Sequence, residues 1–570
     1  MSIKELSMSD DKSDGKSVGF EYSFGTYTTD RYKRNDCVTI KGYEHKADGS
    51  RVPKVYTVVN YKRPFYITKE SFRNHEQKKE WEHRDRLQKF TSTQVNLPNA
   101  IQQALQSHNQ NKSLRSINRS PYVYGADIST TSLLKYQCQK KYPKLVGNPS
   151  TVAALDTETD VVYKTNEINI ISITFKSNIV TAVVRGFFEV DDDDTIRKGI
   201  NDKFQSLLAD DIKERDLKLN LGIFDNAGQA CHWVIRQLNE LKPDFVSIWN
   251  ILFDVPKIME ALEKYGFDLA DTFSDVDVPK EFKYFDWWEC PPIKKKKNGD
   301  EHKLNWFDRW HKLTTPSGSF WLDAAVVYRT LRLADGLEPS YALDSIMKKH
   351  VSRGKLKFTQ TDHLEGLAWH IEMQSNYKYE YVVYNIFDCI GLELLDEETK
   401  DLSSTLPLLS RYSDYHIFQS GPSQISDDLS YYVQEEKNMV IGTVSDRMED
   451  ELEEYVVNRV GWILTLPSYM VDTIGLHVIE GILTPSYLYG HCADLDIEGT
   501  YPNLEFILNL SKETTWRELV AIEGLHTLEA RQWFGIDLSG APANAQEIAS
   551  KVYQLPSYDD VLKLWDEAHA

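Results

Sequence analysis

The chain has 570 residues, which is too long for a single hydrophobic core, so we expect three or four domains. Hydrophobic residues make up 41% and charged residues 27%, as is ordinary for a soluble globular protein. The formal net charge of −20 disfavours a protein that grips nucleic acid by charge over its whole surface.

The negative charge is concentrated in the last third of the chain. Residues 401–570 hold 28 acidic and 9 basic side chains, a net charge of −19, which leaves −1 for residues 1–400. Charge alone would not hold a polyanion on the last third, whereas the first 400 residues carry no such obstacle. The acidic part is either a solvated surface or a surface that docks a basic partner.

Residues 1–17 are polar and are expected to form a disordered tail, not a signal peptide. No stretch is apolar and long enough to cross a bilayer, so no membrane association is expected. The six cysteines form no close pair, which predicts neither a zinc site nor a disulfide framework and favours a reducing cytoplasm.

Residues 18–150 are expected to form an N-terminal α+β domain without a catalytic motif. Residues 38–40, 55–61 and 64–67 are rich in β-branched and aromatic residues, which predicts strands. Residues 75–89 form a polar run that favours a helix.

Residues 151–400 alternate strands with helices, which is typical of an α/β sheet. Strands are predicted at 152–155, 168–175, 179–184 and 244–249. Apolar residues recur at helical spacing from Ala230 to Leu241, and Pro243 ends that helix. Another helical pattern begins near residue 379. Residues 401–570 continue through helical patterns at 423–440 and 445–460.

Three carboxylate motifs stand in order between residues 151 and 400. In residues 154–159, Ala-Leu-Asp-Thr-Glu-Thr, the period of a strand puts Asp156 and Glu158 on one side, so that both can reach one cation. Asp254 follows a predicted strand and starts a predicted helix. Tyr384 and Asp388 are four residues apart and share one helix face.

Four carboxylates from three segments suit two divalent metal ions, and Mg²⁺ or Mn²⁺ prefers such oxygen ligands. One ion would activate a water and the other would stabilise the leaving 3′ oxygen of a cleaved phosphodiester. Each motif alone is weak evidence for an active site, because acids are common at the ends of strands and helices. The occurrence of all three in one α/β domain favours a catalytic site.

The three motifs resemble the exonuclease motifs of family B DNA polymerases, especially the T-even phage type. Supporting stretches are Lys-Pro-Asp at 242–244, Phe-Asp-Val-Pro at 253–256, Pro-Ser-Tyr-Ala-Leu-Asp at 339–344 and Gly-Lys-Leu-Lys at 354–357. The resemblance runs from about residue 151 to 513 and is faint before that. It implies an RNase H-like (DnaQ-type) 3′–5′ exonuclease domain at 151–400. A family B N-terminal domain would precede it, and a partial palm with the start of the fingers would follow at 401–570.

The resemblance also implies roles for individual residues. The ligands of the two Mg²⁺ or Mn²⁺ ions would be Asp156, Glu158, Asp254 and Asp388. Asp156 would bridge both ions, and Tyr384 would orient the attacking water. Asn250 and Phe253 would contact the single-stranded 3′ end of a DNA primer.

Residues 493–503, Ala-Asp-Leu-Asp-Ile-Glu-Gly-Thr-Tyr-Pro-Asn, resemble the first polymerase motif of the same family. Asp496 would be its metal-binding acid, with Asp494 as the weaker alternative, and Tyr501 would exclude a 2′-hydroxyl. The family has Ser-Leu where this chain has Gly-Thr at 499–500. The motifs Lys-x-x-x-Asn-Ser-x-Tyr-Gly and Tyr-Gly-Asp-Thr-Asp do not occur in the sequence. The chain is therefore expected to be a split or truncated half, and DNA synthesis to need a second polypeptide with the rest of the palm, the fingers and the thumb.

The sequence thus predicts the proofreading 3′–5′ exodeoxyribonuclease portion of a replicative polymerase, in the cytoplasm of a phage-infected bacterium, with a sliding clamp as a further partner. One alternative is a free-standing nuclease with four acids and a tyrosine (DEDDy) that acts on DNA or RNA 3′ ends. Another is a non-catalytic scaffold half of a split polymerase, which the intact acids disfavour. An aromatic and basic insertion at 287–321, with Asn298-Gly299 as a tight turn, is either a strand-separating hairpin or a surface loop.

Overall fold

The computed structural model describes residues 17–106, 113–143, 149–295, 301–333, 336–405 and 421–442, together with four strands further on. The chain divides into two compact units, Met1–Val456 and Val457–Ala570. In the second unit, two antiparallel pairs are described: β19 (His477–Val478) with β20 (Tyr487–Leu488), and β21 (Thr515–Glu523) with β22 (Leu528–Ile536). The rest of this section concerns the first unit.

The first unit is built around an eight-stranded mixed sheet with the strand order β11-β10-β9-β8-β12-β17-β16-β13. Its strands are β8 (Val152–Thr159), β9 (Ile168–Phe175), β10 (Asn178–Val184), β11 (Lys218–Phe224), β12 (Phe245–Ile248), β13 (Asp286–Trp288), β16 (Lys312–Thr314) and β17 (Phe320–Asp323). β8, β12 and β17 are mutually parallel, and β9 is antiparallel to both β8 and β10. The predicted strands at 152–155, 168–175, 179–184 and 244–249 all lie in this sheet, which confirms the α/β interpretation.

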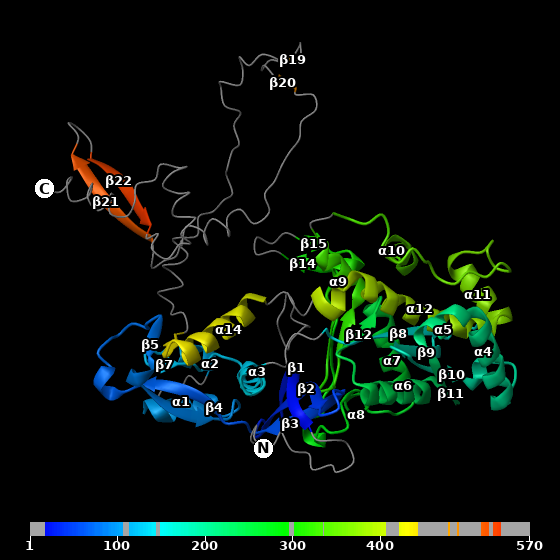
Figure 1. The fold of residues 1–570 in the computed structure, drawn as a ribbon, viewed down its shortest axis with the longest axis horizontal. Helices are drawn as coiled ribbons and strands as arrows, with labels where there is room; N and C mark the ends of the chain where they lie inside the picture. Colours follow the sequence, from blue (N-terminus) through cyan, green and yellow to red (C-terminus); the bar gives the residue numbers. More distant parts are fainter. Residues whose placement is uncertain are drawn as a thin grey trace. The chain divides into compact units, whose positions relative to one another are not determined.

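Helices cover both faces of the sheet because successive strand residues bury opposite sides (Figure 1). On one face, Ala154 and Ile170 pack with α4 (Asp193–Leu207) and α12 (Lys378–Thr399). On the other face, Leu155 packs with two helices, α6 (Ala227–Leu241) and α7 (Ile251–Lys264). Both cores extend to the edge of the sheet where β8 and β12 end.

Shorter helices complete this part: α5 (Ala209–Arg215), α8 (Leu269–Phe273), α9 (Ala324–Leu331), α10 (Leu343–His350) and α11 (Gly366–Asn376). The predicted helix at 230–241 corresponds to α6, which ends at Leu241, immediately before Lys242 in a left-handed conformation and Pro243. No helix in the described part of the chain is long and apolar enough to span a bilayer.

In the described part of residues 17–143, most strands lie in two three-stranded sheets, which are accompanied by three α-helices. The sheets are β1 (Ser17–Thr29), β2 (Asp36–Lys46) and β3 (Arg51–Val59), and β6 (Leu87–Ser92), β4 (Arg63–Thr68) and β7 (Val123–Tyr124). The helices are α1 (Leu97–Leu105), α2 (Leu114–Asn118) and α3 (Thr130–Lys141). The first sheet is tied to the large one by a buried ion pair, in which the Lys41 ammonium lies 3.5 Å from Asp244.

The predicted helix at 75–89 is wrong. Residues of this run form β5 (Trp81–His83) and the start of β6, and β5 pairs with β18 (Met439–Ile441). Lys78 is buried and donates hydrogen bonds of 3.0 Å to the carbonyls of Asn118 and Ser120. Long-range pairing and a buried lysine have overridden a local helical preference.

The predicted helix at 423–440 is confirmed as far as α14 (Gly421–Glu436), after which β18 takes over. The predicted helix at 445–460 and the motif with Asp494, Asp496 and Tyr501 lie outside the described residues.

A candidate metal centre at the end of strand β8

Strand β8 brings two carboxylates to the edge of the sheet. Leu155 and Thr157 are buried on one side, whereas Asp156 and Glu158 alternate with them and are only half-buried. Both acids lie on the face covered by α12, because they have the parity of Ala154 in that core.

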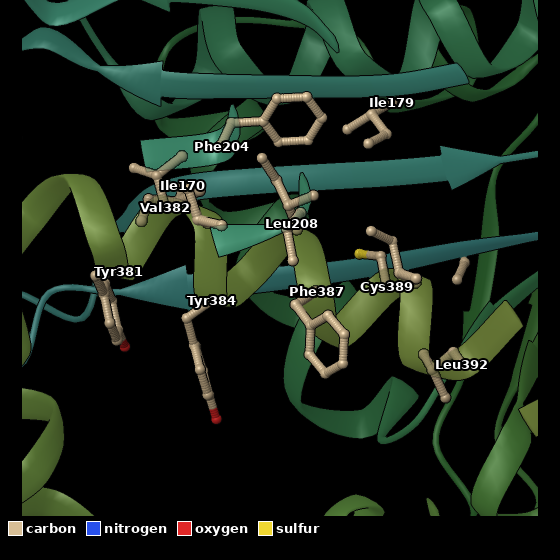
Figure 2. Packing of buried hydrophobic residues seen from close by; sticks show 14 of the residues in the cluster. Ile170, Ile179, Phe204, Leu208, Tyr381, Val382, Tyr384, Phe387, Cys389 and Leu392 are labelled. Atoms are coloured by element: carbon tan, nitrogen blue, oxygen red, sulfur yellow. The ribbon is translucent and has the colours of Figure 1, made fainter. Parts of the chain in front are cut away.

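Helix α12 presents its own polar stripe to these acids. Tyr381, Tyr384, Asn385 and Asp388 recur at intervals of three and four residues and therefore share one face of the helix. The rings of Tyr381 and Tyr384 are stacked, with centroids 5.9 Å apart and planes 6° apart. Figure 2 shows both hydroxyl groups directed the same way. The rest of α12 is embedded in the core, which fixes the position of this stripe.

Three carboxylates converge between β8 and α12. Asp156, Glu158 and Asp388 each offer one oxygen, and these oxygens lie within 4.8 Å of one another. Asp388 Oδ1 is buried and has no hydrogen-bond partner among the described residues. A buried, unpaired carboxylate oxygen beside two other carboxylates fits a divalent cation, which would supply the missing partner.

Asp254 reaches the same region from the first turn of α7 and is buried. Its Oδ1 accepts hydrogen bonds from the backbone nitrogen and hydroxyl of Thr157, at 3.1 and 2.6 Å. Asp254 does not belong to the group of oxygens within 4.8 Å of one another. Its carboxylate is therefore held against β8 at Thr157, and its charge contributes to the raised pKa of Asp156.

Asp323, at the end of β17, holds the start of α7 in place. Its two oxygens accept 3.0 Å hydrogen bonds from the backbone nitrogens of Ile251 and Val326, so one carboxylate joins α7 and α9. Burial raises the pKa of Asp323 to about 7. This side chain positions the turn that carries Asp254.

A second layer of hydrogen bonds orients the carboxylates. Asn385 donates a 2.6 Å bond to Asp156, and Tyr381 donates a short bond to Glu158. The Tyr381 hydroxyl also lies 2.8 Å from His370 Nδ1 and accepts a 3.3 Å bond from Gln374. These contacts connect α11 and α12 to β8 and hold Glu158 in one orientation.

Lys355 is the cation that faces this group of acids. Its ammonium group donates bonds of 2.5 Å to Asp388 and 3.0 Å to the Tyr384 hydroxyl. The neighbouring carboxylates raise the pKa of Lys355 despite its burial, so it stays charged. One ammonium group cannot neutralise four nearby acids, so the ionisation of all four at once is unfavourable.

Burial shifts the ionisation of all four acids toward the protonated form. Burial, followed by neighbouring carboxylates, raises the pKa of Asp156 well above its ordinary value. Burial raises the pKa of Glu158 to about 8 and that of Asp254 to about 7, and it also raises the pKa of Asp388. A bound divalent cation would stabilise the ionised forms of these buried acids, so that all four could lose their protons.

The remaining predicted site residues lie on α7 and before it. Asn250 precedes the helix, is exposed and makes no capping hydrogen bond with its side chain. Phe253 is 45% exposed although it adjoins the buried Asp254. The structure places these two residues at the start of α7 with Asp254, and no hydrogen bond between them and the carboxylates is found among the described residues.

Sequence reasoning missed Lys355, Tyr381, Asn385, Thr157 and Asp323 as site residues. Tyr381 and Asn385 carried a usable signal, because helical spacing from Tyr384 and Asp388 places them on the same stripe. Lys355 lies in a loop, and no spacing rule connects a loop residue with a helix that begins more than twenty residues later.

No protein-family model matches this sequence, and no curated protein matches it either. The interpretation of the site therefore depends on its geometry and on the motifs.

Proposed function

We propose that this chain is a metal-dependent 3′–5′ exonuclease that removes nucleotides from the 3′ ends of DNA strands. The observation that carries the proposal is the convergence of Asp156, Glu158 and Asp388 within 4.8 Å, with an unpaired buried oxygen on Asp388. Three motifs that are far apart in sequence meet at one edge of one sheet. An RNase H-like nuclease domain of the kind found in family B polymerases has this arrangement of acids.

The residues that would hold two Mg²⁺ or Mn²⁺ ions are Asp156, Glu158, Asp388 and, from the first turn of α7, Asp254. When bound, such ions supply an activated water and stabilise the charge that develops on the leaving oxygen and on phosphorus. Within the chain, Asn385 and Tyr381 fix the orientation of two of the carboxylates. Their contacts make the site ready before substrate arrives.

Tyr384 and Lys355 form the polar wall of the site next to Asp388. The Tyr384 hydroxyl receives a hydrogen bond from Lys355, and a water or a phosphate oxygen could accept its own proton in place of Asp388. Lys355 contributes a positive charge that attracts the phosphodiester and offsets the charge that grows during cleavage. Phe253 offers an exposed ring on which a terminal base could stack.

The test is digestion of 3′-labelled single-stranded DNA with Mg²⁺ or Mn²⁺. We expect stepwise shortening from the 3′ end, and no shortening with EDTA or in the double variant Asp156→Ala/Glu158→Ala. The matched control is Asp210→Ala/Glu214→Ala, which removes the same two residue types from an exposed surface. An RNA strand in parallel distinguishes a DNA nuclease from a nuclease of RNA ends. Equal digestion by the double variant and the native chain would contradict the proposal.

Polymerase activity is a separate proposal, because Asp496 and Tyr501 lie outside the described residues. It requires the two polymerase motifs that the sequence lacks, so we propose that a second polypeptide supplies them. Mixing with that polypeptide would restore synthesis that depends on Asp496 and not on Asp156.

A further inference from the structure

A cavity of about 460 Å³ lies away from the carboxylates, where β10 and β11 end and α6 begins. Its volume is within the range of ~300–1,000 Å³ that is usual for small-molecule sites. β10 and β11 are parallel, so their carboxyl ends meet at this edge, where ligands of open α/β sheets usually bind. Figure 1 shows these two strands at the end of the sheet away from β12, with the label of α6 next to theirs.

The cavity lies on the same edge of the sheet as the metal centre but does not share a residue with it. The register places Glu158 opposite Ile170, Ile170 opposite Val183, and Val183 opposite Ile223, which lines the cavity. Glu158 and Ile223 are therefore separated by three strand spacings of about 4.8 Å, which is roughly 14 Å. A ligand in the cavity would therefore be distinct from a group bound at the carboxylates.

Four aromatic side chains line the cavity. Phe224 and Trp233 have ring centroids 5.5 Å apart and planes 47° apart. His232 is stacked on Phe267 with centroids 4.7 Å apart and planes 20° apart. Because burial lowers the pKa of His232, and its Nδ1 lies 3.0 Å from the Thr272 hydroxyl, this ring is a neutral aromatic surface. Such a lining favours a flat aromatic ligand.

Two guanidinium groups line the same cavity, and they differ in their partners. Arg185 is neutralised, because it is paired with Asp193 and with Asp225. Arg236 is half-buried and forms no ion pair or hydrogen bond with any described residue, although its charge contributes to the lowered pKa of Asp271. An unpaired guanidinium group on an aromatic wall can bind a phosphate through two parallel hydrogen bonds.

We propose that this cavity binds a nucleotide, with its base on the aromatic rings of Trp233 and Phe224 and its phosphate on Arg236. The nucleotide could be a free mononucleotide or one unit of a DNA strand, and both present the same base and phosphate. The proposal does not depend on the nuclease activity, because neither the carboxylates nor a metal ion takes part in it.

The test measures binding by isothermal titration calorimetry in EDTA, with the full chain carrying Asp156→Ala and Glu158→Ala so that the metal centre is silent. The probes are dAMP, deoxyadenosine and a dT12 strand. Arg236→Gln should lower the affinity for dAMP at least tenfold and leave the affinity for deoxyadenosine nearly unchanged. Trp233→Leu should lower the affinity for both dAMP and deoxyadenosine. Arg236→Lys should retain part of the affinity for dAMP.

Arg31→Gln, which removes an exposed arginine from the turn between β1 and β2, is the matched control and should bind dAMP normally. Thermal melting of each variant verifies folding, and Trp233→Phe replaces Trp233→Leu if the latter unfolds. If Arg236→Gln also weakens dT12, the site serves a strand, and if it does not, the site serves free nucleotides. Unchanged dAMP affinity in both Arg236→Gln and the Trp233 variant would overturn the proposal, as would no dAMP binding by the parent chain.

Discussion

Lys355 donates a 2.5 Å hydrogen bond to Asp388 and is the positive charge that the described part of the site holds against its acids. Replacing it with methionine keeps the length of the side chain but leaves Asp388 among other carboxylates. We expect Lys355→Met to lower the rate of single-strand digestion by ~10²–10³-fold, as loss of one preorganised charged group does. Single-turnover rates at saturating Mn²⁺ measure the effect. Lys357→Met, two residues away on an exposed position, should digest at the native rate.

Removing the hydroxyl group of each stacked tyrosine should impair digestion in a different way. Tyr384→Phe removes the hydroxyl that Lys355 contacts, so we expect a ~10- to 100-fold slower rate with unchanged metal affinity. Tyr381→Phe frees Glu158 from its hydrogen bond, so we expect weaker Mn²⁺ binding and a rate that recovers at high Mn²⁺. Rates across a Mn²⁺ titration separate the two defects. Identical profiles for both variants would show that their assigned roles are wrong.

The raised pKa values of the acids predict a dependence of stability on pH in the absence of metal. Glu158, with a pKa of about 8, and Asp254, with a pKa of about 7, hold protons that the unfolded chain releases near pH 4. The folded state therefore binds more protons between these values, and the free energy of unfolding falls as pH rises from about 4 to 8.

Divalent metal should counter this loss, because bound cations favour the ionised acids. We expect Mn²⁺ to raise the melting temperature more at pH 8 than at pH 6, as measured by differential scanning calorimetry. The variant Asp156→Asn/Glu158→Gln should show a smaller pH dependence and little response to Mn²⁺. A Mn²⁺ effect that grows toward low pH would contradict the assignment.

The sequence predicted those parts of the site that depend on regular local geometry. Strand alternation places Asp156 and Glu158 together, and helix spacing places Tyr384 with Asp388, without any knowledge of the fold. The strands of the central sheet were predictable for the same reason, because their apolar residues are periodic or continuous.

The parts that escaped prediction depend on contacts between distant segments. Lys355 reaches Asp388 only because its loop is held at Asp344, whose carboxylate accepts a 2.8 Å bond from the Lys355 backbone nitrogen. Residues 75–89 favour a helix locally, yet pairing with β18, more than 350 residues later, makes part of them a strand. The local preference of a sequence for helix or strand does not depend on such distant partners, so it could not predict these contacts.

The buried pair between Lys41 and Asp244 predicts a large loss of stability on truncation of one partner. Lys41 also donates to the carbonyl oxygens of Lys242 and Gly318, and it is fully buried. Lys41→Met would leave Asp244 buried without its cation, at a cost of ~3–5 kcal/mol. Urea unfolding followed by tryptophan fluorescence measures the change, and the exposed Lys62→Met should stay within ~0.5 kcal/mol of the native chain. A loss below ~1 kcal/mol would mean that water or another group replaces the pair.

The insertion between Trp287 and Trp321 contains an antiparallel pair, β14 (Ile293–Lys295) with β15 (Glu301–Lys303), whose residues are exposed. At its base, the backbone nitrogen of Leu304 lies 2.8 Å from the carbonyl oxygen of Pro292. Two glycines can therefore replace residues 293–303 without disturbing β13 and β16, which anchor the insertion in the sheet.

We expect this deletion to leave single-strand digestion within ~2-fold of native and to slow digestion of a paired 3′ end by ~10-fold. The larger effect follows because each base-pair step left unseparated costs ~1.4 kcal/mol, which is tenfold in rate. Parallel digestion of labelled single strands and matched duplexes measures the ratio. A variant with Lys294→Ser and Lys295→Ser keeps the hairpin and removes two of its positive charges. If its ratio of single-strand to duplex digestion rates is native, the effect of the deletion is due to the shape of the hairpin. Equal slowing of both substrates by the deletion would show that the insertion is a surface loop with no part in strand separation.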